Sequence, residues 1–444
     1  MVAPIYIELA LAISVGLFAT WLVSRAGDSS AAAFSLTNHV TTLLLMLFRI
    51  VGAGISVSVA NRIGAGDRDG ASAIARNCFA AAVWSGAVVA LVVVFAAEPL
   101  LRLMRAPPDA LPLATAFMQA MAVAVLLDAL NTTLASVLRA NLFVRDTLKV
   151  FVIANCVQAA LAYWWVPRFG LPGYAAAVTV AAFLALCLHL LFSRVRLGFV
   201  PRLRHRARDW WHVDLNVLRP VLHVGIPAAA ENVAYRLAFM VSVAVAGSLG
   251  GDALATQAYV LQINYGVLLS SLAIGLGVEI IVGHMIGARH FKSARQLVPR
   301  ALALGMLAGA LVAALVALFG RQILSVFTQN PTIIATGAML MWCNVLLEPG
   351  RSFNLIVINA LRAAGDTRFP VLAGAGSMLV VLAGGAWFLC DVVGLGLLGV
   401  WIAYIADEWL RGLVMWWRWK SLAWVPYARA TVRRGRVTKA ASDR

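Results

Sequence analysis

The chain has 444 residues, of which 62% are hydrophobic and 12% charged, and its formal net charge is +17. Soluble domains are nearer half apolar and a quarter charged, so a chain of this composition lacks the polar residues to cover itself in water. Its Lys and Arg residues stand in short connectors between apolar runs, which argues against a nucleic-acid-binding face. The composition therefore predicts a polytopic membrane protein that has the lipid bilayer, and no nucleic acid, as its partner.

Twelve apolar runs follow one another along the chain. A bilayer core about 30 Å thick requires roughly 20 apolar residues per helix, and a single segment in lipid can satisfy its backbone groups only as a helix. We therefore expect an all-α membrane protein with twelve transmembrane helices, near residues 4–24, 33–59, 74–97, 112–137, 148–166, 172–193, 221–248, 255–283, 299–319, 332–360, 369–390 and 395–417.

The Lys and Arg residues predict the orientation of these helices. With both termini in the cytoplasm, the outer connectors hold five of the 36 Lys and Arg residues, four lie within helices, and the other 27 fall on the cytoplasmic side. Cytoplasmic loops carry an excess of Lys and Arg. We therefore expect a multi-pass protein of the cell membrane, the inner membrane of a bacterium, with both termini inside.

The second half of the chain repeats the first. Three pairs of identical residues share a shift of 223 positions: Gly64 and Gly287, Asn131 and Asn354, Arg139 and Arg362. Near the start of each half, a shift of 224 places Asn38 opposite Gln262. Six helices per copy is an even number, so both copies run the same way through the membrane and should be related by a pseudo-two-fold axis along its normal.

This repeat predicts the domain organisation. We expect an N-terminal six-helix bundle (1–195), a basic cytoplasmic linker (196–219), a C-terminal six-helix bundle (220–417) and a basic cytoplasmic tail (418–444). Two such bundles suit a transporter that opens a central cleft to each side in turn. The internal pseudo-dimer makes a monomer sufficient.

The two Ile-Gly-Ala stretches close the second helix of each half. We expect Gly64 and Gly287 to adopt the left-handed conformation that stops a helix. The alternative, a phosphate-binding loop, lacks both common glycine-rich patterns. We therefore interpret these stretches as helix ends at the inner face.

Several stretches together resemble the multidrug and toxic compound extrusion (MATE) family. They are the Ile-Gly-Ala turns, "LRAAGDTRFP" after helix ten, the "GLPG" turn before helix six and "HVGIPAAAEN" at the start of helix seven. The resemblance covers almost the whole chain. It implies two bundles of six helices that export organic, often cationic, compounds in exchange for inward-moving H⁺ or Na⁺. Wider relatives in the same superfamily flip lipid-linked sugars.

Acids within the apolar runs are the candidates for ion coupling. An acid at the middle of a membrane helix costs roughly 2.5–3.5 kcal/mol on insertion scales, so its presence suggests a function. We favour Glu231 on helix seven and Glu348 on helix ten, because acids on these helices form a cation site in the family that the chain resembles. Pro349 and Gly350 are expected to break or kink helix ten and free carbonyl groups for a cation. Glu231 and Glu348 are therefore candidate H⁺ carriers or Na⁺ ligands.

Asp128 is the third coupling candidate. It is the repeat partner of Arg351, and the opposite charges predict either a pair across the bundles or separate local roles. One branch of the resembled family has an Asp on helix one where this chain has Ala19. Because the chain lacks this Asp, we expect the ion-coupling site in the second bundle.

The coupling candidates also have structural interpretations. Glu348 would pair with Arg351, and Glu231 with Arg236, merely to lock helices together. Other acids are assigned to structure alone: Glu279 to a solvated helix end, and Asp407 and Glu408 to a network satisfied by Arg411.

Polar residues on the same helices are candidates for a substrate cavity. Asn38 and Gln262 would line the cavity or serve as amide contacts between helices. Tyr235 offers a cation–π face, and Arg351 and Asn354 lie on helix ten beside the coupling candidates. These residues suit the small organic, often cationic, substrate that the resemblance implies.

Three functions compete at this level. The first is an exporter of drugs or metabolites driven by H⁺ or Na⁺ antiport, without a cofactor or catalytic residues. The second is a flippase for lipid-linked oligosaccharides, which would need a strongly cationic cavity. The third, an intramembrane enzyme, is disfavoured because His39, His189 and His223 stand on separate helices and no hydrolase motif is present.

Overall fold

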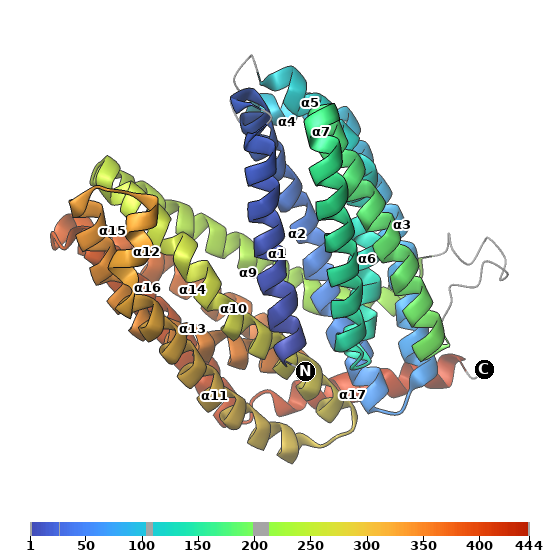
Figure 1. Ribbon diagram of the computed structural model, residues 1–444. Coiled ribbons are helices and arrows are strands. Elements are labelled where there is room, and N and C mark those ends of the chain that lie inside the picture. Colours follow the sequence, from blue (N-terminus) through green and yellow to red (C-terminus); the bar gives the residue numbers. More distant parts are fainter. Residues whose placement is uncertain (1, 26, 104–109, 199–212, 443–444) are drawn as a thin grey trace. The chain divides into compact units, whose positions relative to one another are not determined.

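A computed structural model describes residues 2–25, 27–103, 110–198 and 213–442. These residues form helices and no strand (Figure 1). They divide into two compact units: Ala3–Ala60 with Asp67–Gly225, and Asn61–Gly66 with Ile226–Arg444. Residues 199–212 of the predicted linker (196–219) lie outside the described residues, and the boundaries expected at 195, 219 and 417 stay predictions.

The first unit contains the helices of the first repeat. These are α1 (Val2–Ser24), α2 (Asp28–Gly64), α3 (Arg68–Phe95), α4 (Ala97–Leu103), α5 (Leu111–Ala120), α6 (Ala122–Ala140) and α7 (Val144–Leu197). The apolar run expected near 112–137 is divided into α5 and α6, which meet at Met121. A buried cluster that includes Leu101, Met118 and Leu171 forms the core of this unit.

The second unit is built mainly from the second repeat. Its elements are α9 (Leu215–Ser248), α10 (Gly251–Gly287), α11 (Phe291–Leu318), α12 (Gly320–Phe327), α13 (Pro331–Ala363), α14 (Arg368–Ser377), η1 (Met378–Gly384), α15 (Gly385–Trp387), η2 (Phe388–Val392), α16 (Gly396–Lys420) and α17 (Val425–Ser442). The short helices α4 and α12, which the apolar runs do not predict, begin 223 residues apart and extend the repeat. The predicted tail from residue 418 contains the end of α16 and the helix α17.

Helix α7 contains two membrane crossings. Its backbone is non-helical at Gly170, where φ is +63°, between Pro167 and Pro172. The two arms on either side of Gly170 pack against each other, since Val150 and Ala185 share one buried cluster. The two helices predicted near 148–166 and 172–193 are therefore present as the arms of a hairpin.

The number of crossings agrees with the sequence. Ten helices in the described part of the chain are long and apolar enough to cross a bilayer. Helix α7 supplies a second crossing, and α16, with 25 residues, completes the twelve. The predicted all-α architecture with two six-helix repeats is confirmed.

The Ile-Gly-Ala stretches are close-contact sites, and the expectation of a left-handed glycine at Gly64 and Gly287 was wrong. Both are the last helical residues of α2 and α10, and the left-handed residues are Gly66 (φ +74°) and Arg289 (φ +62°). Within the second unit, a Cβ atom on Gly64 would stand 2.1 Å from the carbonyl oxygen of His284. A Cβ atom on Gly287 would stand 2.0 Å from the carbonyl oxygen of Asn61. The absence of a side chain is what allows these backbones to approach.

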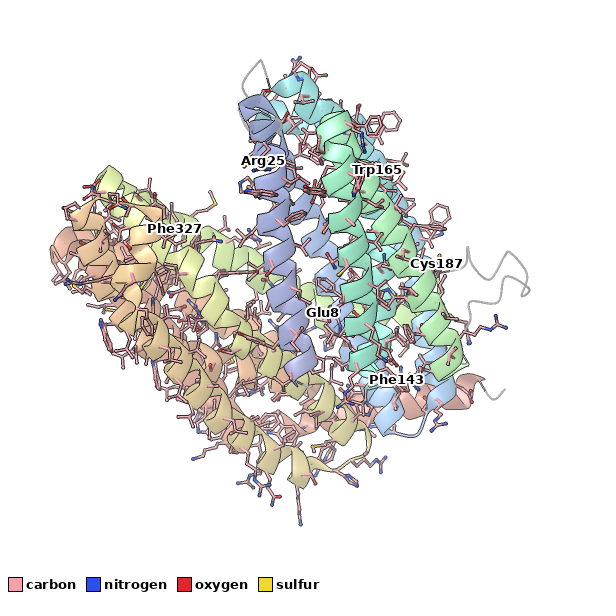
Figure 2. The ribbon with its side chains drawn as sticks, in the orientation of Figure 1. Glu8, Arg25, Phe143, Trp165, Cys187 and Phe327 are labelled. Carbon is pink, nitrogen blue, oxygen red and sulfur yellow. The ribbon has the colours of Figure 1, made fainter. Side chains whose placement is uncertain are left out.

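Each repeat contains an equivalent ion pair between its first and fourth predicted membrane helices. In the first unit, Arg139 Nη2 on α6 donates to Glu8 Oε1 on α1 at 2.8 Å, and Figure 2 labels Glu8 on its helix. In the second unit, Arg362 Nη2 on α13 donates to Glu231 Oε2 on α9. Both members of the second pair lie 223 positions after those of the first. Because both copies keep it, this pair belongs to the scaffold.

A similar pair closes the end of each repeat. Arg196 Nε at the end of α7 donates to Asp146 Oδ2 at 2.9 Å. Arg418 Nε near the end of α16 donates to Asp366 Oδ2 at 2.8 Å. Each Asp precedes a Thr at the turn into the fifth membrane helix of its repeat. The two repeats therefore share helix order and two classes of ion pair.

Alanine at Gly64 or Gly287 should destabilise the protein. The added methyl group meets a backbone carbonyl that cannot rotate away, and overpacking of this kind costs about 1–3 kcal/mol. We expect both variants to melt below the wild type in detergent, as measured by loss of the monodisperse peak after heating. Gly16→Ala is the matched control, since nothing lies within 4 Å of its Cβ position. Equal melting of Gly64→Ala and Gly16→Ala would contradict the contact.

Candidate functional site

Five charged side chains meet in the interior of the second unit. Glu348 and Arg351 lie on α13, and Asp407, Glu408 and Arg411 lie on α16. All five side chains are buried, and Glu348 is 0% exposed. We call these five residues the α13–α16 charge cluster. Charges so far from water require partners, because burying an unpaired ion is costly.

The pairing within the α13–α16 charge cluster is continuous. Arg351 Nη1 donates to Glu348 Oε1 at 2.5 Å, and Arg351 Nε is 3.5 Å from Glu408 Oε1. Arg411 Nη2 is 3.1 Å from Glu408 Oε2 and 2.6 Å from Asp407 Oδ2. Glu408 therefore bridges the two guanidinium groups, and the outer carboxylates belong to Glu348 and Asp407.

Neutral polar groups complete this arrangement. Asn354 Nδ2 donates to Glu408 Oε2 at 3.0 Å, and the Ser377 hydroxyl donates to Asp407 Oδ1 at 2.6 Å. The Tyr235 hydroxyl on α9 interacts electrostatically with Arg351 and Glu408. The cluster thus joins α9, α13, α14 and α16.

The cluster has one more acid than base. Its three carboxyl groups face two guanidinium groups, so full ionisation leaves one negative charge in the apolar interior. Two buried oxygens, Glu348 Oε2 and Asn354 Oδ1, have no hydrogen-bond partner among the residues that the structure describes. A buried acceptor without a donor costs free energy, so the site is suited to a proton or another small cation.

The α13 helix stays continuous through the site, and the expected break at Pro349 and Gly350 was wrong. Residues Pro331–Ala363 form one helix with Pro349 inside it. A Cβ atom on Gly350 would stand 2.6 Å from Trp409 Cδ1. Gly350 therefore allows α13 and α16 to pack closely, which brings their charged side chains together.

A second group of charges lies beside the cluster. Glu231 pairs with Arg362, and not with Arg236 as one interpretation of the sequence held. The charge of Glu231 also acts on Arg411 of the cluster. Glu279, expected at a solvated helix end, is 2% exposed, and Arg362 acts on it. That expectation was wrong, because this face of α10 packs against α13.

Uncharged polar groups extend from the cluster through the second unit. The hydroxyl groups of Tyr404 and Ser242 are 2.6 Å apart, and Gln257 Nε2 donates to the Tyr404 hydroxyl at 3.3 Å. Asn344 donates to Asn264 at 2.6 Å and accepts from Trp401 at 2.9 Å. All of these side chains are buried.

The first repeat lacks the cluster. At the shift of 223, Val125 stands where Glu348 does and Asp128 where Arg351 does. At the shift of 226 that aligns the last helices, Ala181, Ala182 and Ala185 stand where Asp407, Glu408 and Arg411 do. The duplication therefore separates scaffold charges, which occur twice, from cluster charges, which occur once.

The structure brings some of the predicted site residues together and separates others. Glu348 and Arg351 belong to the cluster, Asn354 and Tyr235 interact with it, and Glu231 is adjacent to it. Asp128 is half-buried in the first unit, where its Oδ2 lies 3.5 Å from the Thr132 hydroxyl. Asn38 and Gln262 lie on exposed faces of α2 and α10.

The network of Asp407 and Glu408 with Arg411, expected from the sequence, is present, but its connection to Glu348 through Arg351 was not predicted. The aligned repeats carry the signal that identifies these three residues, because three alanines occupy these positions in the first copy. Arg362 as the partner of Glu231 was also missed. The alignment of the repeats places Glu231 at the position of Glu8 and Arg362 at the position of Arg139. It would have predicted the second pair only once the first pair was known.

Comparison with known proteins identifies the family. The family description MatE matches residues 4–164 and 227–387, one match in each repeat. The chain is 31% identical over 428 residues to the uncharacterized transporter YisQ of Bacillus subtilis, with 95% of this chain and 93% of YisQ covered. It is 24% identical to the multidrug resistance protein PmpM of Pseudomonas aeruginosa, with 84% and 79% covered.

Solved structures have the same fold. An outward-facing multidrug resistance MATE family transporter of the MOP superfamily superposes with a TM-score of 0.88 at 20% identity, over 97% of this chain and 95% of that chain. A MOP superfamily transporter from Pyrococcus furiosus superposes with a TM-score of 0.85 at 19% identity, over 98% and 95%. With the family match in both repeats and the 31% identity to YisQ, these findings show that the chain is a multi-pass membrane protein of the MATE family.

Proposed function

We propose that the protein exports small organic cations across the cell membrane in exchange for protons, and that the α13–α16 charge cluster is where protons are bound. The observation that carries this proposal is the excess carboxyl group in a buried cluster that only the second repeat contains. The name of PmpM, a multidrug resistance protein, supports export of organic compounds. Alternating exposure of the two repeats to each side is part of the proposal.

Glu348 is the proposed proton acceptor of the cluster. Its Oε1 is held by Arg351, whereas its Oε2 is buried without a partner. A guanidinium group 2.5 Å from the carboxylate repels a metal cation through direct charge repulsion. A proton needs a single oxygen, which Glu348 Oε2 provides. This favours H⁺ over Na⁺ as the coupling ion.

Protonation of Glu348 would change the pairing of its neighbours. The added proton removes the excess negative charge and weakens the ion pair between Glu348 and Arg351. Arg351 would then pair with Glu408 alone. Because Glu408 also contacts Arg411 and Asn354, one proton can shift contacts on α13 and α16 together. A bound organic cation would compete with the proton for the same negative charge, and this competition is the basis of antiport.

The polar residues outside the cluster are proposed to contact substrate. Asn38 and Gln262 present amide groups on exposed helix faces, and Tyr235 offers an aromatic face for a cation. Asn354 and Arg351 would transmit the state of the cluster. Asp128, with its half-buried carboxyl group, is proposed as a secondary cation contact in the first unit.

A flippase for anionic lipid-linked sugars is less well supported. Such a substrate needs unpaired cationic groups, and Arg351 and Arg411 are both paired with carboxylates.

Glu348→Gln should uncouple transport from the proton gradient. The variant leaves two carboxyl groups with two guanidinium groups, so the cluster is neutral without a proton. A hydrogen bond to a charged group is worth about 1.5–3 kcal/mol, so we expect a fall in flux on the order of tenfold or more. The measurement is uptake of a fluorescent organic cation into inverted vesicles under an imposed proton gradient and then a Na⁺ gradient.

Two variants control this measurement. Glu98→Gln removes an exposed pair with Arg102 and should leave the flux unchanged. Glu8→Gln removes the scaffold pair of the first unit and tests whether loss of any internal carboxylate has the same effect. Flux that follows only the Na⁺ gradient, or that survives in Glu348→Gln, would rule out the cluster as the proton site.

The orientation predicted from Lys and Arg is part of this proposal. With both termini in the cytoplasm, a green fluorescent protein fused after residue 444 should fluoresce in a bacterial host. An alkaline phosphatase fused at the same place should be inactive, because that enzyme requires the periplasm. The reverse pattern would exclude the orientation, and with it the assignment of α17 to the inner face.

A further inference from the structure

Glu279 is a buried carboxyl group that has no part in the proposed cycle. It lies on α10, two turns before the helix ends at Gly287. The side chain is 2% exposed, and its Oε1 has no hydrogen-bond partner in the described part of the chain. One turn earlier on the same face, a Cβ atom on Gly275 would stand 2.6 Å from Asn359 Nδ2 of α13. Glu279 therefore faces the stretch of α13 that carries Arg362.

Arg362 is within electrostatic reach of two carboxyl groups. It donates to Glu231 Oε2, and its charge also acts on Glu279. Leu302 of α11 and Ala428 of α17 belong to the apolar cluster that also contains Val278 and Val282 of α10. Arg362 is a charged group that acts on Glu279 from a neighbouring helix.

The other ionisable groups near this end of α10 are His284 on the same helix and Arg62 at the end of α2. His284 follows Glu279 by five residues, and Arg62 is buried. Both have interactions of their own. The charge found to act on Glu279 is that of Arg362, which also pairs with Glu231.

The first repeat shows what this arrangement adds. Glu8 and Arg139 form the equivalent pair, but Ser56 stands where Glu279 does, at the shift of 223. The Ser56 hydroxyl lies 3.5 Å from the Ser136 carbonyl oxygen and carries no charge. In the first unit Arg139 pairs with one carboxyl group, that of Glu8. In the second unit Arg362 pairs with Glu231 and also acts on Glu279.

We propose that Glu279 is a proton-binding site that alternates with Glu231 for the Arg362 guanidinium group. One positive charge can neutralise one carboxylate, so the other carboxyl group carries a proton. In the observed arrangement Arg362 holds Glu231, and the proposal places the proton on Glu279. In the alternative arrangement, the O–H bond on Glu279 breaks, an O–H bond forms on Glu231, and Arg362 pairs with Glu279.

This exchange conserves charge and atoms, because one proton moves from Glu279 to Glu231. The net charge of Glu231, Glu279 and Arg362 together is zero in both arrangements. Because Glu231 also acts on Arg411, the exchange connects the inner end of α10 with the α13–α16 charge cluster. Glu279 would then be the group through which protons leave the cluster towards the inner face. This inference rests on the proposed function in that protons drive transport.

Infrared spectroscopy of the purified protein in lipid tests the proton on Glu279 without relying on transport. The carboxylic C=O stretch at neutral pH counts protonated acids. We expect Glu279→Gln to lose one protonated carboxyl group. Glu231→Gln should lose one as well, because Glu279 then ionises to pair with Arg362. The double variant should again lose one, and Glu8→Gln should lose none.

Two spectroscopic results would overturn the inference. If Glu279→Gln loses no protonated carboxyl group, Glu279 is ionised in the wild type. If the double variant loses two, the acids hold their protons independently and do not share Arg362.

Transport gives the second test. Glu279→Gln fixes Arg362 on Glu231, so proton-driven flux should fall on the order of tenfold or more, while substrate binding at constant pH stays unchanged. Wild-type flux in Glu279→Gln would overturn the inference and leave the proposed function intact. A wild type without proton-driven flux would overturn the proposed function instead, and the infrared measurement would still decide whether Glu231 and Glu279 share one proton.

Discussion

The structure depends on the pairing of buried carboxylates with guanidinium groups in an apolar surrounding. A charged side chain at the middle of a membrane helix is costly to insert, and removing one partner of a buried pair leaves an uncompensated charge. Helices that carry such residues must therefore pack so that the charges meet. In the second unit this condition joins α13 to α16 through Arg351 and Glu408, and α9 to α13 through Glu231 and Arg362.

The duplication separates ion pairs that both repeats contain from charged residues that the second repeat alone contains. Glu8 with Arg139 and Glu231 with Arg362 occur at equivalent positions, so their common role is to hold the first and fourth membrane helices of each repeat together. The α13–α16 charge cluster has no equivalent in the first unit, although the fold there is the same. The first unit is therefore evidence that the architecture does not require the cluster, and its cost in the second unit indicates a function.

Much of the fold could be predicted because a chain within lipid must satisfy its backbone hydrogen bonds internally, which leaves few possible structures. The twelve apolar runs and the repeat follow from composition and spacing, whereas the residues that end the helices after Gly64 and Gly287 do not. The site was predicted in part: Glu231, Glu348 and Arg351 are recognisable as charges in apolar runs. Their partners depend on helix rotation and packing, which a single sequence does not specify. Gly350 illustrates this limit, since it reads as a helix breaker and acts instead as the place where Trp409 of α16 packs against α13.

A buried network with equal numbers of carboxylates and guanidinium groups is neutral when every group is ionised. Such a network does not need a proton or a metal ion to balance its charge. Here the cluster has three carboxyl groups for two guanidinium groups, and Arg362 has two carboxyl groups within its reach. An excess of one acid over the arginines forces a choice, because one carboxyl group at each place must be neutralised by something other than an arginine. A proton can take either place and leaves the helices intact. The same pairing that holds the second unit together thus leaves, at each place, one carboxyl group more than the arginines can neutralise.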